Sequence, residues 1–175
     1  MKVSVVPYTE VDGVRTFSDS GIKRLFLRTL EDDLATVVFY EGTVRTEEQF
    51  LAVMKYGECL FYVIYIDADV IGYAWLNRFE NRTARYHFCA FKDYWGRLDD
   101  VAPEIMSTLF KLKDSKNKPL FDLFTGYIPI WNKPAVKFTL KHGGRSAGEI
   151  PNAIYNAETK QSEPAIFIYY TRGDV

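Results

Sequence analysis

The stretch at residues 90–100, AFKDYWGRLDD, has residue types that could bind a phosphate. It follows a run that is typical of a strand and precedes a run that is typical of a helix. Backbone N–H groups at the start of a helix attract anions, and Lys92 and Arg97 could add positive charge. The stretch holds a single glycine, Gly96, and the Asp93 carboxylate would repel a phosphate unless it caps the helix or pairs with Arg97. These residues leave two interpretations open, a phosphate cradle and an ordinary loop.

Two side chains ahead of this stretch could move a proton. His87 lies in the strand-like run RYHFCAF, and an imidazole with an ordinary pKa of about 6.5 could deprotonate an ammonium group. The alternative is a strand histidine whose hydrogen bonds are satisfied by neighbours or solvent. Glu80, at the end of the preceding strand-like run, is the second candidate base, and its alternative is an exposed turn carboxylate. Strand alternation places Arg85, His87 and Cys89 on one face, but it does not tell which face meets a substrate.

The elements that would position these groups begin with a predicted antiparallel meander. Three consecutive runs are rich in β-branched and aromatic residues and are separated by polar turns, as in a meander. A strand precedes them at the N-terminus, followed by two helices, the second of which begins with the capping-box pattern of Thr46 and Gln49. The predicted strands cover residues 2–8, 59–66, 70–79 and 84–91, and the first helix covers residues 19–32.

After the AFKDYWGRLDD stretch the pattern alternates between helix and strand. A helix is predicted over 101–112, with Asp99 or Asp100 as its cap and Pro103 in its first turn. A strand over 120–128 follows, and then a helix over 132–142 that ends at Gly143. Two closing strands, 145–155 and 165–171, are separated by the polar loop NAETKQSEP. This order predicts an α/β fold with a mixed sheet, a meander followed by β-loop-α-β and α-β, in one domain over residues 1–175.

Composition excludes some classes of function. The 175 residues carry 22 basic and 23 acidic side chains, so no long-range basic field attracts nucleic acid or an anionic membrane. Cys59 and Cys89 lie in apolar runs, which favours reduced buried thiols over metal ligands. No apolar run approaches the length of a membrane span, so we expect a cytoplasmic protein with no membrane, metal or nucleic-acid partner.

The C-terminal run WNKPAVKFTLKHGGRSAGE resembles a motif of the Gcn5-related N-acetyltransferases. Asn132, Ala135 and the turn glycine Gly143 match that motif, and the order of elements matches the family over nearly the whole chain. The resemblance implies an acyl-CoA N-acyltransferase fold that carries acetyl-CoA in a V-shaped opening between the fourth and fifth strands. It also makes Asn132 a cofactor contact, which is compatible with a role as helix N-cap.

Two positions depart from the family's catalytic motif. Thr139 stands where the family usually has the Tyr that protonates the leaving thiolate, and Gly144 stands where it usually has Phe. A Thr hydroxyl is a much weaker acid than a phenol, so the proton donor would be another group, a water, or absent. In the pyrophosphate loop only Gly96 matches the family, and Leu98 replaces a small residue. The loop is therefore a degraded or divergent cradle, and both retained and lost binding of coenzyme A stay open.

Two functions remain open from the sequence. The first is an acetyl-CoA-dependent N-acetyltransferase in which a backbone N–H near Phe91 polarises the acetyl carbonyl and His87 or Glu80 removes a proton from a small-molecule or peptide amine. The second is a non-catalytic binding or assembly domain, which Thr139, Asp93 and the many aromatic residues all fit. The tail IPNAI also resembles divergent domains of bacteriophage and prophage proteins. The oligomeric state is open, with a homodimer among the alternatives. Candidate catalytic residues are His87, Glu80 and Thr139, and candidate cofactor residues are Ala90, Phe91, Lys92, Tyr94, Trp95, Gly96, Arg97, Leu98 and Asn132.

Overall fold

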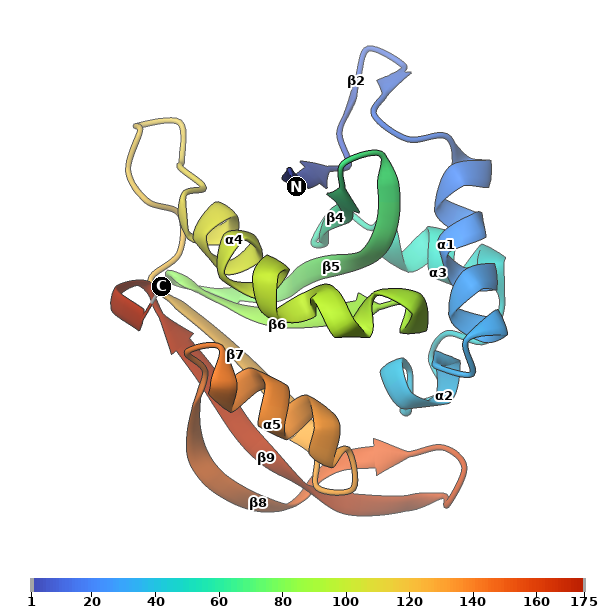
Figure 1. Cartoon of the computed structure of the whole chain (residues 1–175), viewed down its shortest axis with the longest axis vertical. Coiled ribbons are helices and arrows are strands. Elements are labelled where there is room, and N and C mark those ends of the chain that lie inside the picture. The colour runs from blue at the N-terminus through green and yellow to red at the C-terminus, as the bar shows by residue number, and fades with distance from the viewer. Residues whose placement is uncertain (1, 175) are drawn as a thin grey trace.

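A seven-stranded mixed sheet forms the centre of the structure, which is a computed structural model that describes residues 2–174 (Figure 1). The strands stand in the order β1-β4-β5-β6-β7-β9-β8, and only the β6–β7 pair is parallel. The predicted α/β fold with a mixed sheet is therefore confirmed. The strands of this sheet are β1 (Val3–Pro7), β4 (Leu60–Ile66), β5 (Asp69–Glu80), β6 (Thr83–Ala90), β7 (Leu123–Pro129), β8 (Arg145–Asn156) and β9 (Gln161–Thr171).

The predicted meander consists of β4, β5 and β6. Its two turns contain Asp67 at φ 54° and Asn81 at φ 53°, and Asp and Asn are residue types that tolerate this left-handed conformation. Trp75 in the middle of β5 stands opposite Phe61 of β4 and His87 of β6. The meander thus carries the chain from the candidate bases to the AFKDYWGRLDD stretch, as the sequence predicts.

Three helices lie against one face of the meander: α1 (Asp19–Glu31), α2 (Ala35–Val38) and α3 (Glu47–Met54). The capping box at the start of α3 is present, with Thr46 accepting from the Gln49 N–H and the Gln49 side chain accepting from the Thr46 N–H. Aromatic rings fill the space between these helices and the sheet. Phe50 packs on Phe26 with ring centroids 5.5 Å apart and on Tyr73 at 5.2 Å.

The opposite face is covered by α4 (Leu98–Phe110) and, beside it, α5 (Lys133–Lys141) (Figure 1). Ile105 and Leu109 of α4 are buried in a core that includes Phe124 of β7 and Tyr170 of β9. Helix α5 begins and ends as predicted, with Asn132 as its N-cap and Gly143 at φ 87° after its last turn.

The start of α4 differs from the prediction. A 3₁₀ helix, η1 (Lys92–Arg97), leads directly into α4 at Leu98, and the N-cap residue Arg97 makes no side-chain cap bond. The prediction of Asp99 or Asp100 as the cap is therefore wrong, because both residues lie in the first turn. Pro103 consequently falls beyond the first turn of α4, and not within it as predicted. At this interior position the proline removes one helical hydrogen bond.

Short elements and one loop also differ from the prediction. A small hairpin of β2 (Glu10–Val11) and β3 (Val14–Arg15), the single-turn α2 and the 3₁₀ helix η2 (Arg172–Asp174) are too short to leave a periodic pattern. The predicted loop NAETKQSEP is mostly strand, because β8 and β9 pair as far as Asn156 and Gln161.

Two further expectations concern the state of the cysteine thiols and membrane-spanning helices. Cys89 is buried, Cys59 is half-buried, and both are free thiols. Burial raises the pKa of each thiol to about 12, so both are protonated at neutral pH. Within residues 2–174 no helix is both long and apolar enough to cross a membrane.

Candidate active site between β6 and β7

Strands β6 and β7 pair only at their beginnings and then separate. The parallel ladder runs from Thr83 opposite Leu123 to Arg85 opposite Thr125 and ends there. A cavity of about 610 Å³ occupies the space that opens beyond this point, between the two strands and helices α4 and α5. Gly126 lies where the strands part, and a side chain there would stand 3.4 Å from the Tyr86 carbonyl oxygen and 3.2 Å from Ile168. The expected V-shaped opening is therefore present.

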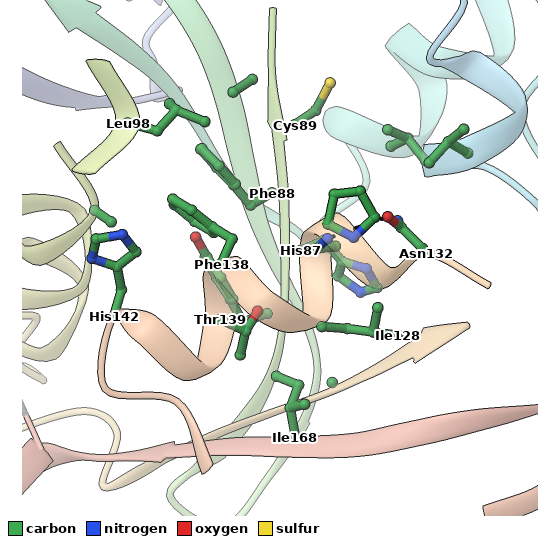
Figure 2. A pocket seen from close by; sticks show the side chains of 18 of the residues that line it. His87, Phe88, Cys89, Leu98, Ile128, Asn132, Phe138, Thr139, His142 and Ile168 are labelled. Carbon is green, nitrogen blue, oxygen red and sulfur yellow. Dashed lines mark hydrogen bonds between the residues drawn. The ribbon is translucent and has the colours of Figure 1, made fainter. Parts of the chain in front are cut away.

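The walls of this cavity are mainly apolar. Phe88 of β6 stacks on Phe138 of α5 with ring centroids 6.1 Å apart. Figure 2 shows this pair between His142 at one end of the cavity and His87 with Asn132 at the other. An apolar pocket of this volume with a few polar groups is typical of a site for a small molecule or cofactor.

The backbone of β6 directs polar groups toward the space that opens beyond the end of the β6–β7 ladder. The N–H of Phe91 does not face the cavity, because it donates to the Ile71 carbonyl of β5 at 2.9 Å. Alternation along an antiparallel strand then directs the backbone N–H and C=O of Phe88 and Ala90 away from β5, toward the separated β7. These groups could pair with an amide-containing ligand as a strand would.

The loop after β6 is tied to helix α1. The Lys92 N–H donates to the buried Asp32 carboxylate at 2.8 Å, and Lys92 Nζ lies 3.7 Å from Asp33. Asp93 forms an ion pair with Arg28, not with Arg97, which was the partner that the sequence offered as one alternative. This pair neutralises a carboxylate that would otherwise repel a phosphate. In a 3₁₀ helix the N–H groups bond three residues back, so η1 leaves few of them for a ligand.

The predicted cofactor residues divide into two groups. Ala90, Trp95, Leu98 and Asn132 line the cavity. The Trp95 indole N–H donates to the Ala90 carbonyl at 2.9 Å, which places the half-exposed ring at the cavity wall. The structure does not bring the other five to the cavity lining: Phe91 is buried in the core with α1 and α3, and Lys92, Tyr94, Gly96 and Arg97 lie outside it.

Helix α5 holds the residues that matched the acetyltransferase motif. The Asn132 side chain accepts from the Ala135 N–H at 3.3 Å, so it caps the helix and also lines the cavity. Thr139 is buried in the cavity wall, and its carbonyl accepts from the Gly144 N–H at 2.9 Å. A side chain at Gly144 would approach Thr139 Cγ2 to 2.4 Å, which explains why a Phe cannot stand there in this chain.

His87 lies in the cavity wall as a neutral imidazole. Its ring stacks on Trp75 with centroids 4.5 Å apart, and Nε2 lies 3.1 Å from Asn77 Oδ1. Burial, together with the positive charges of Arg85 and Arg78, lowers the pKa of His87 to about 3. A group with so low a pKa accepts a proton weakly. Glu80 is exposed at the end of the β5–β6 hairpin and does not line the cavity.

Several residues at this end of the cavity were not singled out by the sequence. Tyr40, after α2, and Tyr127, on β7, line the cavity beside His87. Burial raises the pKa of Tyr40 to about 12, so its phenol stays protonated at neutral pH. A backbone irregularity in β5 between Asn77 and Glu80 holds Arg78 at φ 50° near the same place. No local pattern in the sequence marks these residues, because three separate parts of the chain bring them together.

No protein-family model and no curated protein matches the sequence. Solved acetyltransferases share its fold. Spermidine N-acetyltransferase from Vibrio cholerae, in complex with CoA and spermine, aligns with a TM-score of 0.68 and 12% identity over 98% of this chain and 96% of that one. The ribosomal L7/L12 α-N-protein acetyltransferase RimL aligns with a TM-score of 0.70 and 13% identity over 98% and 96%. RimL in complex with coenzyme A aligns with a TM-score of 0.67 over 89% and 90%. The chain therefore has the fold of the Gcn5-related N-acetyltransferases.

Proposed function

We propose that this protein is an acetyl-CoA-dependent N-acetyltransferase that acts on an amine. The observation that carries the proposal is the separation of β6 and β7 after Arg85 and Thr125, which opens the 610 Å³ cavity between α4 and α5. Coenzyme A is present in solved acetyltransferases of the same fold, which supports the same use of the cavity here.

The cavity suits the thioester-bearing arm of coenzyme A, which is narrow and contains two amide groups. The Phe88 carbonyl and the Ala90 N–H, which face away from β5, would bond those amides, and the apolar pair Phe88 and Phe138 would line the rest of the arm. Asn132 would contact the arm from the start of α5. Acetyl-CoA would supply an acetyl group activated as a thioester.

The chain's own groups would then assist attack by a neutral amine. The Phe88 N–H would polarise the acetyl carbonyl as negative charge develops on its oxygen. His87 would orient the amine by accepting a hydrogen bond at Nδ1. The proton that the amine loses would go to water, since a pKa of about 3 makes the imidazole a weak base. Thr139 would hold a water that donates a proton to the departing thiolate, in place of the Tyr of the family. Glu80 has no part in this proposal, because its carboxylate is exposed at the hairpin.

A second candidate function, a non-catalytic domain, is favoured by the loop after β6. The Trp95 indole N–H already bonds the Ala90 carbonyl oxygen. Asp99 and Asp100 place two carboxylates in the first turn of α4, where a diphosphate would bind. These groups weaken the diphosphate end of the site while leaving the cavity open. Binding and catalysis therefore need separate tests.

Calorimetric titration with acetyl-CoA tests the proposal. Ala135→Trp would fill the cavity from the first turn of α5, and Lys133→Trp, exposed on the same helix, is the matched control. We expect micromolar binding by the wild type and Lys133→Trp and none by Ala135→Trp. Release of free thiol with a panel of amines would then establish transfer. No heat at millimolar acetyl-CoA from the folded protein would overturn the proposal, and binding without thiol release would favour the non-catalytic domain.

A further inference from the structure

A second cavity, of about 80 Å³, adjoins the large one beside His87. Tyr40, His87 and Tyr127 line both cavities, so the two are neighbours. Unlike the large cavity, the small one is surrounded by polar side chains, including Asn77, Arg78 and Arg85. The candidate acetyl-transfer site thus continues into a polar recess on the side away from the loop after β6.

Arg85 is the central group of this recess. It is half-buried on β6, and its guanidinium carbon lies 5.0 Å from the centre of the Tyr127 ring. Among residues 2–174 no hydrogen bond or ion pair involves its guanidinium. Burial lowers the pKa of Arg85, and the charge of Arg78 lowers it further. Arginine still keeps its charge in proteins, so its N–H donors are partly desolvated and have no acceptor among the described side chains.

Arg78 brings a second positive charge to the same recess. The left-handed backbone at Arg78, within the irregular pairing of β5 and β6, redirects the chain there as a β-bulge does. Glu41 is the one carboxylate among the described residues that line the recess, and it is exposed. The recess therefore carries a net positive charge, and an anion would satisfy the free donors of Arg85.

We propose that the acceptor amine also carries an anionic oxygen group, a carboxylate or a phosphate, which Arg85 and Arg78 bind in the recess. This inference rests on the proposed acetyltransferase function. Arg85 and His87 lie on the same face of β6, two residues or about 7 Å apart. A small molecule could therefore place its anion on Arg85 and its amine beside His87 in the large cavity. A polyamine such as spermidine would be repelled by the two arginines.

Direct anion binding tests the recess without any acetyl transfer. Glutarate and inorganic phosphate are titrated into the wild type, Arg85→Gln, Arg85→Lys, Arg78→Gln and Arg24→Gln, with chemical shifts or heat as the readout. Arg24→Gln removes an exposed arginine of α1 and is the charge-matched control. We expect binding that is lost in Arg85→Gln, weakened about tenfold or more in Arg85→Lys and Arg78→Gln, and unchanged in Arg24→Gln. Equal weak binding by all five proteins would overturn the inference.

Matched acceptors test the same recess during transfer. β-Alanine is compared with β-alanine amide, phosphoethanolamine with ethanolamine, and spermidine is added as a cationic acceptor. We expect the anionic member of one pair to have a kcat/KM at least about tenfold higher, and Arg85→Gln to remove that advantage through KM while acetyl-CoA binding stays unchanged. Preference for the amides or spermidine, with acetyl-CoA bound normally, would overturn the inference and leave the proposed function intact. Failure of acetyl-CoA to bind would instead reject the proposed function, and the anion titration would still decide the recess.

Discussion

The indole N–H of Trp95 donates a hydrogen bond to the Ala90 carbonyl oxygen across 2.9 Å, although the Trp95 side chain is half exposed. Ala90 is the last residue of β6, and its carbonyl faces the space where a ligand would lie along the strand. The Trp95 side chain thus bonds the carbonyl that a ligand lying along the strand would otherwise bond.

Trp95→Phe removes this bond and keeps an aromatic ring at the cavity wall. Because this bond competes with coenzyme A for the Ala90 carbonyl, the affinity for acetyl-CoA should rise about fivefold, which corresponds to the net worth of one neutral hydrogen bond, about 1 kcal/mol. Calorimetry on Trp95→Phe and the wild type measures the change. A loss of affinity would mean that the indole itself holds the coenzyme.

A second prediction concerns Asp99, which joins the beginning of α4 to the end of α5. Its carboxylate bonds Lys141 and lies 2.8 Å from His142 Nε2, and these partners lower the pKa of Asp99. Asp99→Asn removes a negative charge near the expected diphosphate position and frees Lys141 to bind phosphate. We expect acetyl-CoA affinity to rise about threefold at low salt, and the gain to shrink as salt screens it.

Asp100→Asn is the matched control for that variant. Asp100 lies in the same turn, but no ion pair in the described part of the chain involves it. Asp100→Asn should therefore raise the affinity for acetyl-CoA less than Asp99→Asn does. Equal gains from both variants would indicate a general charge effect at the start of α4 and would contradict a specific role for the contact with Lys141.

Local signals in the sequence were sufficient for most elements of the fold. Thr46 with Gln49 and Asn132 with Gly143 mark helix ends through side-chain caps and a left-handed glycine, and both act within a few residues. The same reasoning failed for Pro103, because a 3₁₀ helix has no clear periodic signal and allowed α4 to begin before the predicted start.

The details of the candidate site depended on contacts between distant segments. Asp93 pairs with Arg28, 65 positions earlier. The residues of the loop alone therefore could not show which cation neutralises the Asp93 carboxylate. The recess beside His87 likewise combines Tyr40, Arg78 and Tyr127 from three parts of the chain. Chemistry at these places follows from tertiary packing, which a single sequence does not encode in any short motif.

The neutral state of His87 predicts a dependence of stability on pH. Its pKa is about 3 in the folded protein and 6.5 as the ordinary value, so the unfolded chain takes up this proton first as pH falls. The contribution of the neutral histidine to stability is therefore full above pH 6.5 and is lost as pH falls toward 3, by at most roughly 1.4 kcal/mol per pH unit.

His87→Gln isolates this contribution, because glutamine can still donate to Asn77 but does not ionise in this range. Urea unfolding of the wild type and the variant between pH 7 and pH 4 should show the wild type losing more stability, so that the difference between the two narrows or reverses at acid pH. Parallel curves would show that His87 has an ordinary pKa in the folded protein.

The last prediction concerns Gly144, where the chain turns from α5 into β8. A methyl group at this position would lie 2.4 Å from Thr139 Cγ2, 2.8 Å from the Thr139 carbonyl oxygen and 2.9 Å from Tyr170 Cζ. The carbonyl belongs to the helix backbone and Tyr170 is buried, so neither can move aside without disturbing the core. Gly144→Ala should therefore lower the free energy of unfolding by about 2 kcal/mol or more. Gly57→Ala is the control, since a methyl group there meets nothing within 4 Å. Equal stability of the two variants in urea would mean that the end of α5 adjusts freely, which would contradict the tight packing of Thr139 against Gly144 in the cavity wall.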